Sequence, residues 1–171
     1  MKQVHNSSIL RERFSDEGRG SIIIEFAFIL PLLVILFAVI IDLGLLIREH
    51  QILQNAAREG ARFSSLPQNK IDTVNPSATA EAIRDRVIYY LERENISVAT
   101  ADCEADPTIP KKWTCGDIVI RQSYPITIGG IVSNASEVTI AYDRSPLIPG
   151  PPFFPGGDVT LGGRAVFRNL Y

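Results

Sequence analysis

The sequence is poor in the residues that build metal centres and nucleic-acid interfaces. Its 171 residues include two histidines and two cysteines, too few for a multi-histidine metal centre or a zinc finger. The formal net charge is −2 and the basic residues form no block, so the positive surface that binds nucleic acid is missing. Hydrophobic residues make up 46% of the chain, which disfavours a disordered tail. The composition therefore disfavours a metalloenzyme, a nucleic-acid binder and a disordered chain.

Recognisable catalytic motifs are also missing. The sequence contains no G-x-S-x-G, H-E-x-x-H, P-loop or G-x-G-x-x-G pattern, and neither His5 nor His50 pairs locally with a nucleophile or a metal ligand. Asp102 and Glu104 are two carboxylates of the kind that acid–base catalysis uses, but a solvated turn beside a disulfide is the favoured interpretation. We therefore predict that the protein is not an enzyme and has no cofactor, no metal and no small-molecule substrate.

Charged and polar side chains are absent from 26–41. The flanking acids Glu25 and Asp42 are seventeen residues apart, or about 26 Å along a helix. A hydrocarbon slab is about 30 Å thick, so both acids can lie near its edges. We predict a membrane span over about 22–47, with a kink at Pro31, which membranes tolerate. A buried helix of a soluble protein is disfavoured, because too little chain remains to surround it.

The two flanks of the span differ in positive charge. Four basic residues precede it, and Arg48, Arg58 and Arg62 follow it. Because the more basic flank stays in the cytoplasm, we expect a cytoplasmic N-terminus and an extracytoplasmic remainder. Cys103 and Cys115 agree with this orientation, because an oxidising compartment lets them form a disulfide. Two unrelated thiols are the alternative.

The helical pattern continues past the membrane edge. Apart from a tolerated glycine, no helix breaker occurs before Pro67, which predicts one helix over 21–66, about 69 Å long. Several small or apolar residues fall close to one of its faces: Leu53, Ala57, Gly60 and Ala61. Small side chains permit close approach of another backbone. The pattern leaves open whether that backbone belongs to the protein's own sheet or to another subunit.

The region 67–171 is predicted to be a small α+β domain. Helical spacing of apolar residues after the candidate cap Asn75 predicts a helix over 76–94. Alternation then predicts three or more antiparallel strands, around Ile118 and Ile120, around Val138, Ile140 and Tyr142, and around Val159 and Leu161. Gly162-Gly163 predicts a β-bulge in the last strand. The proline-rich loop before that strand carries Phe153-Phe154, either as an exposed recognition tip or as rings folded onto the sheet.

The junction between the polar segment 1–20 and the apolar helix is unusual. The leader ends in Gly20, and Glu25 is the fifth residue after that glycine. An ordinary secretory signal is cut after its apolar core, whereas cleavage here, between Gly20 and Ser21, would leave the whole core on the mature protein. Such cleavage would create an ammonium group at Ser21, one helical turn from the carboxylate of Glu25. An acid that favours the positive end of the helix is the alternative interpretation of Glu25.

This junction resembles the cleavage site of type IV prepilins. Further matches follow at Glu25-Phe26, at Pro31, at Asp42-Leu43-Gly44 and in the run from Gln54 to Arg62, QNAAREGAR. Their order is similar to that of the TadE-like family, the minor pseudopilins of tight-adherence pilus and secretion systems. Members of that family often carry tyrosine where this chain has Phe26.

The resemblance implies a bacterial inner-membrane subunit that a prepilin peptidase processes. It also implies partners among other pilin-like subunits and the pilus assembly platform, with possible incorporation into a pilus. The residues it assigns to the assembly helix are Phe26, Pro31, Asp42, Ala57, Gly60 and Ala61. An alternative function is an uncleaved, single-pass membrane-anchored receptor or binding module. Asp42 is interpreted as a marker of the membrane edge in preference to a relay group.

Overall fold

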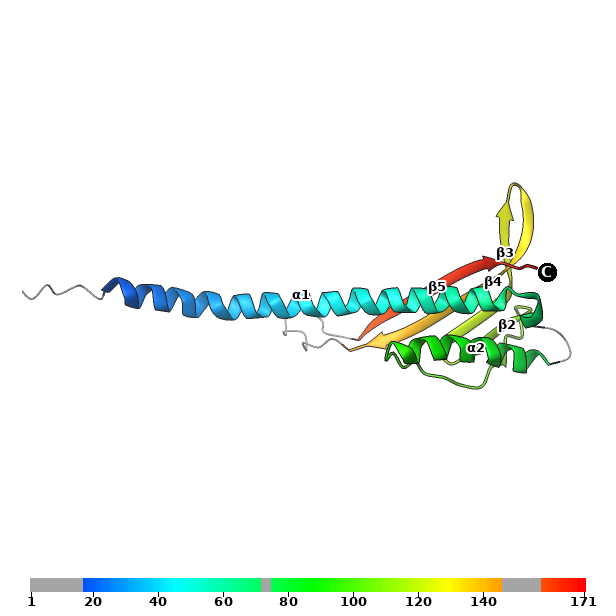
Figure 1. Ribbon diagram of the computed structural model, residues 1–171, viewed down its shortest axis with the longest axis horizontal. Helices are drawn as coiled ribbons and strands as arrows, with labels where there is room; N and C mark the ends of the chain where they lie inside the picture. The colour runs from blue at the N-terminus through cyan, green and yellow to red at the C-terminus, as the bar shows by residue number, and fades with distance from the viewer. Residues whose placement is uncertain (1–16, 72–74, 146–157) are drawn as a thin grey trace, which may run out of the picture. The chain divides into compact units, whose positions relative to one another are not determined.

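The structure, a computed structural model, describes residues 17–71, 75–145 and 158–171. The chain divides into two compact units, Met1–Ile40 and Ile41–Tyr171, and we call the second one the head unit. The expected α+β class is confirmed, because a long N-terminal helix precedes a small domain with a short helix and a five-stranded antiparallel sheet (Figure 1). Phe153-Phe154 lies outside the described residues.

Helix α1 spans Glu17–Ser64 and continues through Pro31. It therefore begins four residues before the predicted start and ends two residues before the predicted end. The end has a local cause, because the residue before a proline is disfavoured in the helical region. Leu66, which precedes Pro67, is accordingly extended, with φ −74° and ψ 145°, and the short 3₁₀ helix η1 follows at Pro67–Asn69.

From Phe26 to Ile40, helix α1 is apolar on every side. From Ile22 to Ile40 its large hydrophobic side chains are between 46% and 79% exposed. Among the described residues, α1 is the one helix long and apolar enough to cross a membrane, with a mean hydropathy of 2.9 in its most apolar window. Nothing in the described chain covers this surface, which is the property expected of a single-pass membrane anchor.

The sheet of the head unit is an antiparallel meander in which neighbours in sequence are neighbours in space, in the order β1-β2-β3-β4-β5. Its strands are β1 at Glu104–Ala105, β2 at Lys112–Cys115, β3 at Ile118–Ile128, β4 at Ile131–Arg144 and β5 at Val159–Arg168. The disulfide Cys103–Cys115, with an S–S distance of 2.03 Å, confirms the predicted pairing. It ties the residue before β1 to the last residue of β2.

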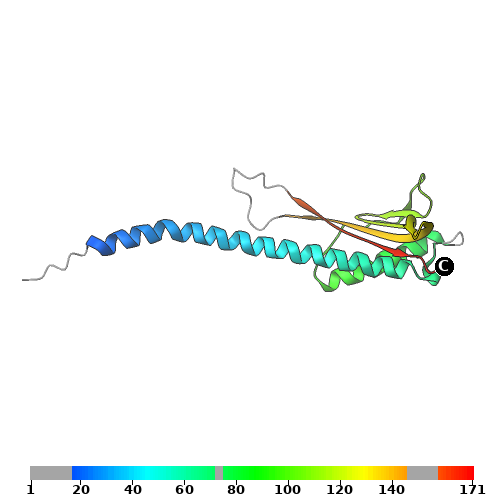
Figure 2. The same cartoon turned by 90° about the horizontal axis from the view of Figure 1, so that it is seen from above.

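One face of this sheet is covered by helices. Helix α2, at Pro76–Arg93, confirms the predicted second helix, although Asn75 makes no side-chain cap bond. The core joins α1, α2 and the sheet through buried residues such as Leu53, Ile83 and Ile140. Figure 2 shows both helices on the same side of the sheet. The compact unit begins at Ile41, because the second part of α1 supplies part of this core.

The predicted bulge at Gly162-Gly163 is wrong. Strand β5 pairs with β4 without a register shift, from Val159 opposite Arg144 to Arg168 opposite Ala135. A Cβ atom on Gly163 would lie 2.4 Å from the carbonyl oxygen of Leu53, so glycine is needed there because α1 crosses β5 at close range. The irregularity of the sheet lies in β3 instead, between Arg121 and Tyr124.

Candidate assembly helix

The candidate processing site lies in the first turns of α1. Gly20 and Ser21 are helical in their backbone, and Glu25 is exposed four residues after Ser21. Phe26 is 62% exposed. Four residues correspond to about one helical turn, so an ammonium group at Ser21 would lie on the same side of the helix as Glu25.

The small-residue face of α1 packs within the head unit. Leu53, Ala57 and Ala61 are completely buried, and a Cβ on Gly60 would lie 2.4 Å from Cγ2 of Val87 in α2. The sequence left open whether this face approaches the protein's own sheet or another subunit. The structure shows that it packs within the protein's own fold, against both the sheet and α2. Any subunit contact of α1 must use other residues.

Asp42 is part of a charged cluster that the sequence analysis did not find. Arg144, the last residue of β4, donates from Nη2 to Oδ1 of Asp42 over 2.6 Å. Its Nε lies 2.7 Å from Oε2 of Glu49, without the alignment of a hydrogen bond, so this second contact is purely electrostatic. The Arg144 side chain is only 7% exposed. The cluster joins β4 to α1 at the predicted membrane edge.

Two polar residues of the QNAAREGAR run also hold α1 in place. The Gln54 side chain contacts the edge of β5, donating to the carbonyl oxygen of Gly162 and accepting from the Arg164 amide at 3.5 and 3.4 Å. Glu59 accepts from Arg86 of α2 at 2.6 Å. Much of the run that carries the resemblance is therefore used for packing inside the head unit.

A buried glutamine ties the end of α1 to the bulge of β3. Gln122, 2% exposed, donates from Nε2 to the carbonyl oxygens of Ser64 and Asn69. Its Oε1 accepts from the Ile71 amide and from the Tyr171 hydroxyl. Burial raises the pKa of Tyr171 above its ordinary value. Hydrogen bonds of this kind stabilise a fold because each of their buried polar groups is satisfied.

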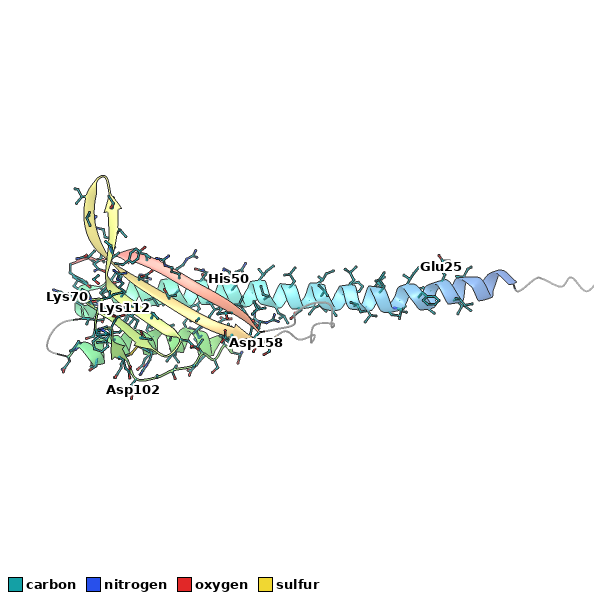
Figure 3. The ribbon with its side chains drawn as sticks, turned by 180° about the vertical axis from the view of Figure 1, so that it is seen from behind. Glu25, His50, Lys70, Asp102, Lys112 and Asp158 are labelled. Atoms are coloured by element: carbon teal, nitrogen blue, oxygen red, sulfur yellow. A yellow bond between two sulfur atoms is a disulfide. The ribbon has the colours of Figure 1, made fainter. Side chains whose placement is uncertain are left out.

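The candidate acid–base residues do not form a site. Asp102 and Glu104 are exposed, and Figure 3 shows Asp102 and His50 on separate elements and apart from one another. Among the described residues, no group of three or more histidines, cysteines, aspartates or glutamates is arranged to hold a metal ion. Asp106 has a structural role, since Lys112 and the Thr108 hydroxyl and amide hold the pKa of its carboxyl well below its usual range.

The comparisons with known proteins agree with the resemblance. The model of the family described as TadE-like protein matches residues 20–62, a segment that begins at Gly20 and ends in the last turn of α1. No curated protein and no solved structure matches the chain. The family match supports a membrane protein associated with a tight-adherence pilus system.

Proposed function

We propose that this protein is a minor pilin-like subunit that acts in the assembly of a tight-adherence pilus or secretion apparatus, after a prepilin peptidase cleaves between Gly20 and Ser21. The observation that carries the proposal is the family match, which starts at the glycine of the candidate cleavage site and covers most of α1. Its partners are the peptidase, other pilin-like subunits and the assembly platform. The leader lies in the cytoplasm and the head unit outside the inner membrane.

The exposure of α1 supports the same proposal. Its small-residue face is already occupied within the head unit, so the apolar surface left for lipid and for neighbouring subunits is that of 22–47, where Leu43 and Ile47 are also exposed. Phe26 and Pro31 belong to this segment. In a bilayer it lies in lipid, and in an assembly it packs against the corresponding segments of other subunits through van der Waals contact.

Glu25 has a specific role in this scheme. An acid placed in the bilayer centre costs about 2.5–3.5 kcal/mol on insertion scales. The cost is smaller near the edge, where Glu25 is expected, and the Ser21 ammonium created by cleavage offsets part of it. The ammonium belongs either to the same chain or to an adjacent subunit, and the second arrangement gives neighbouring helices a defined register. Cleavage then couples maturation to assembly, because the uncleaved chain lacks this cation.

The cleavage step is tested with Gly20→Arg in cells with and without the prepilin peptidase. We expect the wild-type chain to lose twenty residues only when the peptidase is present, with a mature N-terminus at Ser21 by mass spectrometry. Gly20→Arg stays full-length in both cases. Gly18→Arg is the matched control, because it adds the same charge to the leader and leaves the scissile glycine intact.

The outcomes separate the proposal from a permanent receptor. Equal lengths for wild type and Gly20→Arg with the peptidase present contradict processing and favour an uncleaved membrane-anchored binding module. Trimming beyond Ile47 would remove the membrane segment and contradict the proposal in another way. If processing occurs, Glu25→Gln should be cleaved but should not be incorporated into a pilus assembly, whereas a wild-type yield of incorporated Glu25→Gln contradicts the role of the carboxylate.

A further inference from the structure

Two sides of α1 differ in polarity where the helix enters the head unit. On one of them, which we call the sheet side, Asp42 and Glu49 both contact Arg144 of β4. On the other, which we call the open side, Leu43 and Ile47 are one helical turn apart. These two aliphatic side chains are 55% and 49% exposed, although the residues belong to the same compact unit as the sheet.

The open side is uncovered, and it becomes polar only after Ile47. A Cβ on Gly44 would meet no atom of the described chain within 4 Å. One turn above Ile47 comes Gln51, which is exposed. Arg48 turns toward the end of α2, where its Nη2 lies 3.6 Å from Oε2 of Glu94. The apolar surface of the open side therefore ends at Ile47.

The sheet side becomes polar earlier along the helix, at Asp42. The base of the sheet lies beside it, because Arg144 contacts Asp42 and Ser145 follows Arg144 at the end of β4. The Ser145 hydroxyl donates to Oδ1 of Asp158 over 2.7 Å, and both residues are exposed. Figure 3 shows Asp158 displaced from His50 toward the N-terminal end of α1. Polar groups on this side therefore begin more than one helical turn before the last apolar residue of the open side.

A membrane surface perpendicular to α1 cannot suit both sides. If the hydrocarbon ended at Asp42 all round the helix, Leu43 and Ile47 would keep exposed apolar surface in water, which is unfavourable. If it ended at Ile47 all round, the exposed carboxylate of Asp158 would lie in hydrocarbon, where an ionised group is costly. Both conflicts disappear when the hydrocarbon reaches Ile47 on the open side and ends at Asp42 on the sheet side.

We propose that the membrane surface next to the head unit crosses α1 obliquely, with lipid hydrocarbon in contact with Leu43, Gly44 and Ile47 on the open side. Lipid is the occupant because this side continues the exposed apolar surface of the membrane segment along the same helix. Asp42 and Ile47 differ by about 7.5 Å along a helix about 10–12 Å wide, which corresponds to a tilt of about 35°. Transmembrane helices tilt by up to about 40°, and polar anchors set the direction.

The tilt gives the head unit a defined direction relative to the membrane. Because lipid covers the open side, α1 leans toward that side, and the base of the sheet rises on the other side, where Asp158 stays in water. The Arg144 cluster, between the sheet and α1, then marks the lower end of the aqueous side. The inference uses the membrane anchor alone, and it depends neither on cleavage of the leader nor on assembly of a pilus.

The oblique surface is tested by lipid quenching of a fluorophore on the full-length chain in phosphatidylcholine vesicles. Both native cysteines are in the disulfide, so bimane on an added cysteine reports on one position. Bromine on the upper acyl chains should quench bimane on Ile47→Cys several-fold more than bimane on Ser145→Cys, at the base of the sheet. Gln51→Cys, one turn above Ile47 on the same side, is the matched control and should be quenched as weakly as Ser145→Cys.

Three results would overturn the proposal. Equal quenching of Ser145→Cys and Ile47→Cys would show a perpendicular membrane surface with the base of the sheet in lipid. Quenching of Ile47→Cys as weak as that of Gln51→Cys would show that lipid does not reach the open side, and Leu43→Cys repeats this comparison lower on the helix. Disulfide-linked dimers of Ile47→Cys in place of quenching would identify another copy of the chain as the occupant. The fluorescence of Trp113, the one tryptophan, checks before labelling that each variant is folded.

Discussion

The two parts of α1 are one continuous helix in two different environments. Leu33, in the first unit, is 46% exposed, whereas Leu53, in the head unit, is completely buried. The first part is apolar on every side from Phe26 onward, and the second part has one buried face of small and apolar residues with polar residues elsewhere. The same residue type is therefore exposed in one part and belongs to the core of a domain in the other.

The difference follows from what surrounds each part. A helix that is apolar all round needs a nonpolar environment supplied from outside, whereas an amphipathic helix is covered on one side by its own domain. Stability of the head unit should accordingly depend on the second part alone. Assembly should depend on the first part.

Matched truncations give the largest expected contrast. Leu53→Ala should lower the free energy of unfolding of the head unit by about 2–5 kcal/mol, because it leaves a cavity in the core. Leu33→Ala should leave that free energy unchanged. Urea unfolding of the full-length chain in detergent, followed by the fluorescence of Trp113, measures the free energy of unfolding of both variants. Equal losses of that free energy for Leu33→Ala and Leu53→Ala would show that the head unit also depends on the first part of α1.

Removal of the Arg144 guanidinium, which lies between two acids of α1, should have the next largest effect on the stability of the head unit. Arg144→Ala leaves Asp42 and Glu49 facing each other without their positive partner. Breaking a fully buried pair costs about 3–5 kcal/mol, and because the two acids are 21% and 22% exposed, we expect a loss of about 2 kcal/mol. Arg62→Ala is the control, since Arg62 is exposed on α1. A loss for Arg62→Ala as large as that for Arg144→Ala would contradict the role of the cluster.

The smallest contrast compares two adjacent glycines. Gly163→Ala should destabilise the head unit by about 1–2 kcal/mol, because its Cβ meets the backbone of Leu53, which cannot move aside without shifting α1. Gly162→Ala should change stability by less than about 0.5 kcal/mol, since the nearest atom to its Cβ is 4.0 Å away. The same unfolding measurement applies, and indistinguishable variants would contradict the close approach of α1 to β5.

Several features of the fold were accessible from local pattern. Periodicity, helix-start signals and residue type predict four of them, and the structure confirms each: the helix through Pro31, the helix after Asn75, the alternating strands and the disulfide. The bulge was misplaced because a glycine pair in a strand has two physical explanations, a change of register and a close backbone approach. Only the position of Leu53 beside Gly163 distinguishes them.

The charged cluster and the buried glutamine illustrate what local pattern cannot contain. Arg144 is 102 residues from Asp42, and Gln122 is 58 residues from Ser64. Because Asp42 and Glu49 are seven residues apart on a helix, the sequence indicates that these two acids share a face. It does not indicate which basic residue lies between them. Gln122 continues the alternation of Ile118 and Ile120 on the buried face of β3, but that pattern does not identify the groups at the end of α1 to which it bonds.

Residue order alone establishes the apolar anchor, the glycine–acid junction before it and the alternation of helix and strand. These features depend on neighbours within a few positions, and the physics of a helix or a bilayer acts directly on such neighbours. The folded chain was needed to show that the small-residue face of α1 is covered from within and that β5 pairs with β4 only as far as Ala135. Both depend on where distant segments meet, because burial and backbone pairing are properties of the partner as much as of the residue.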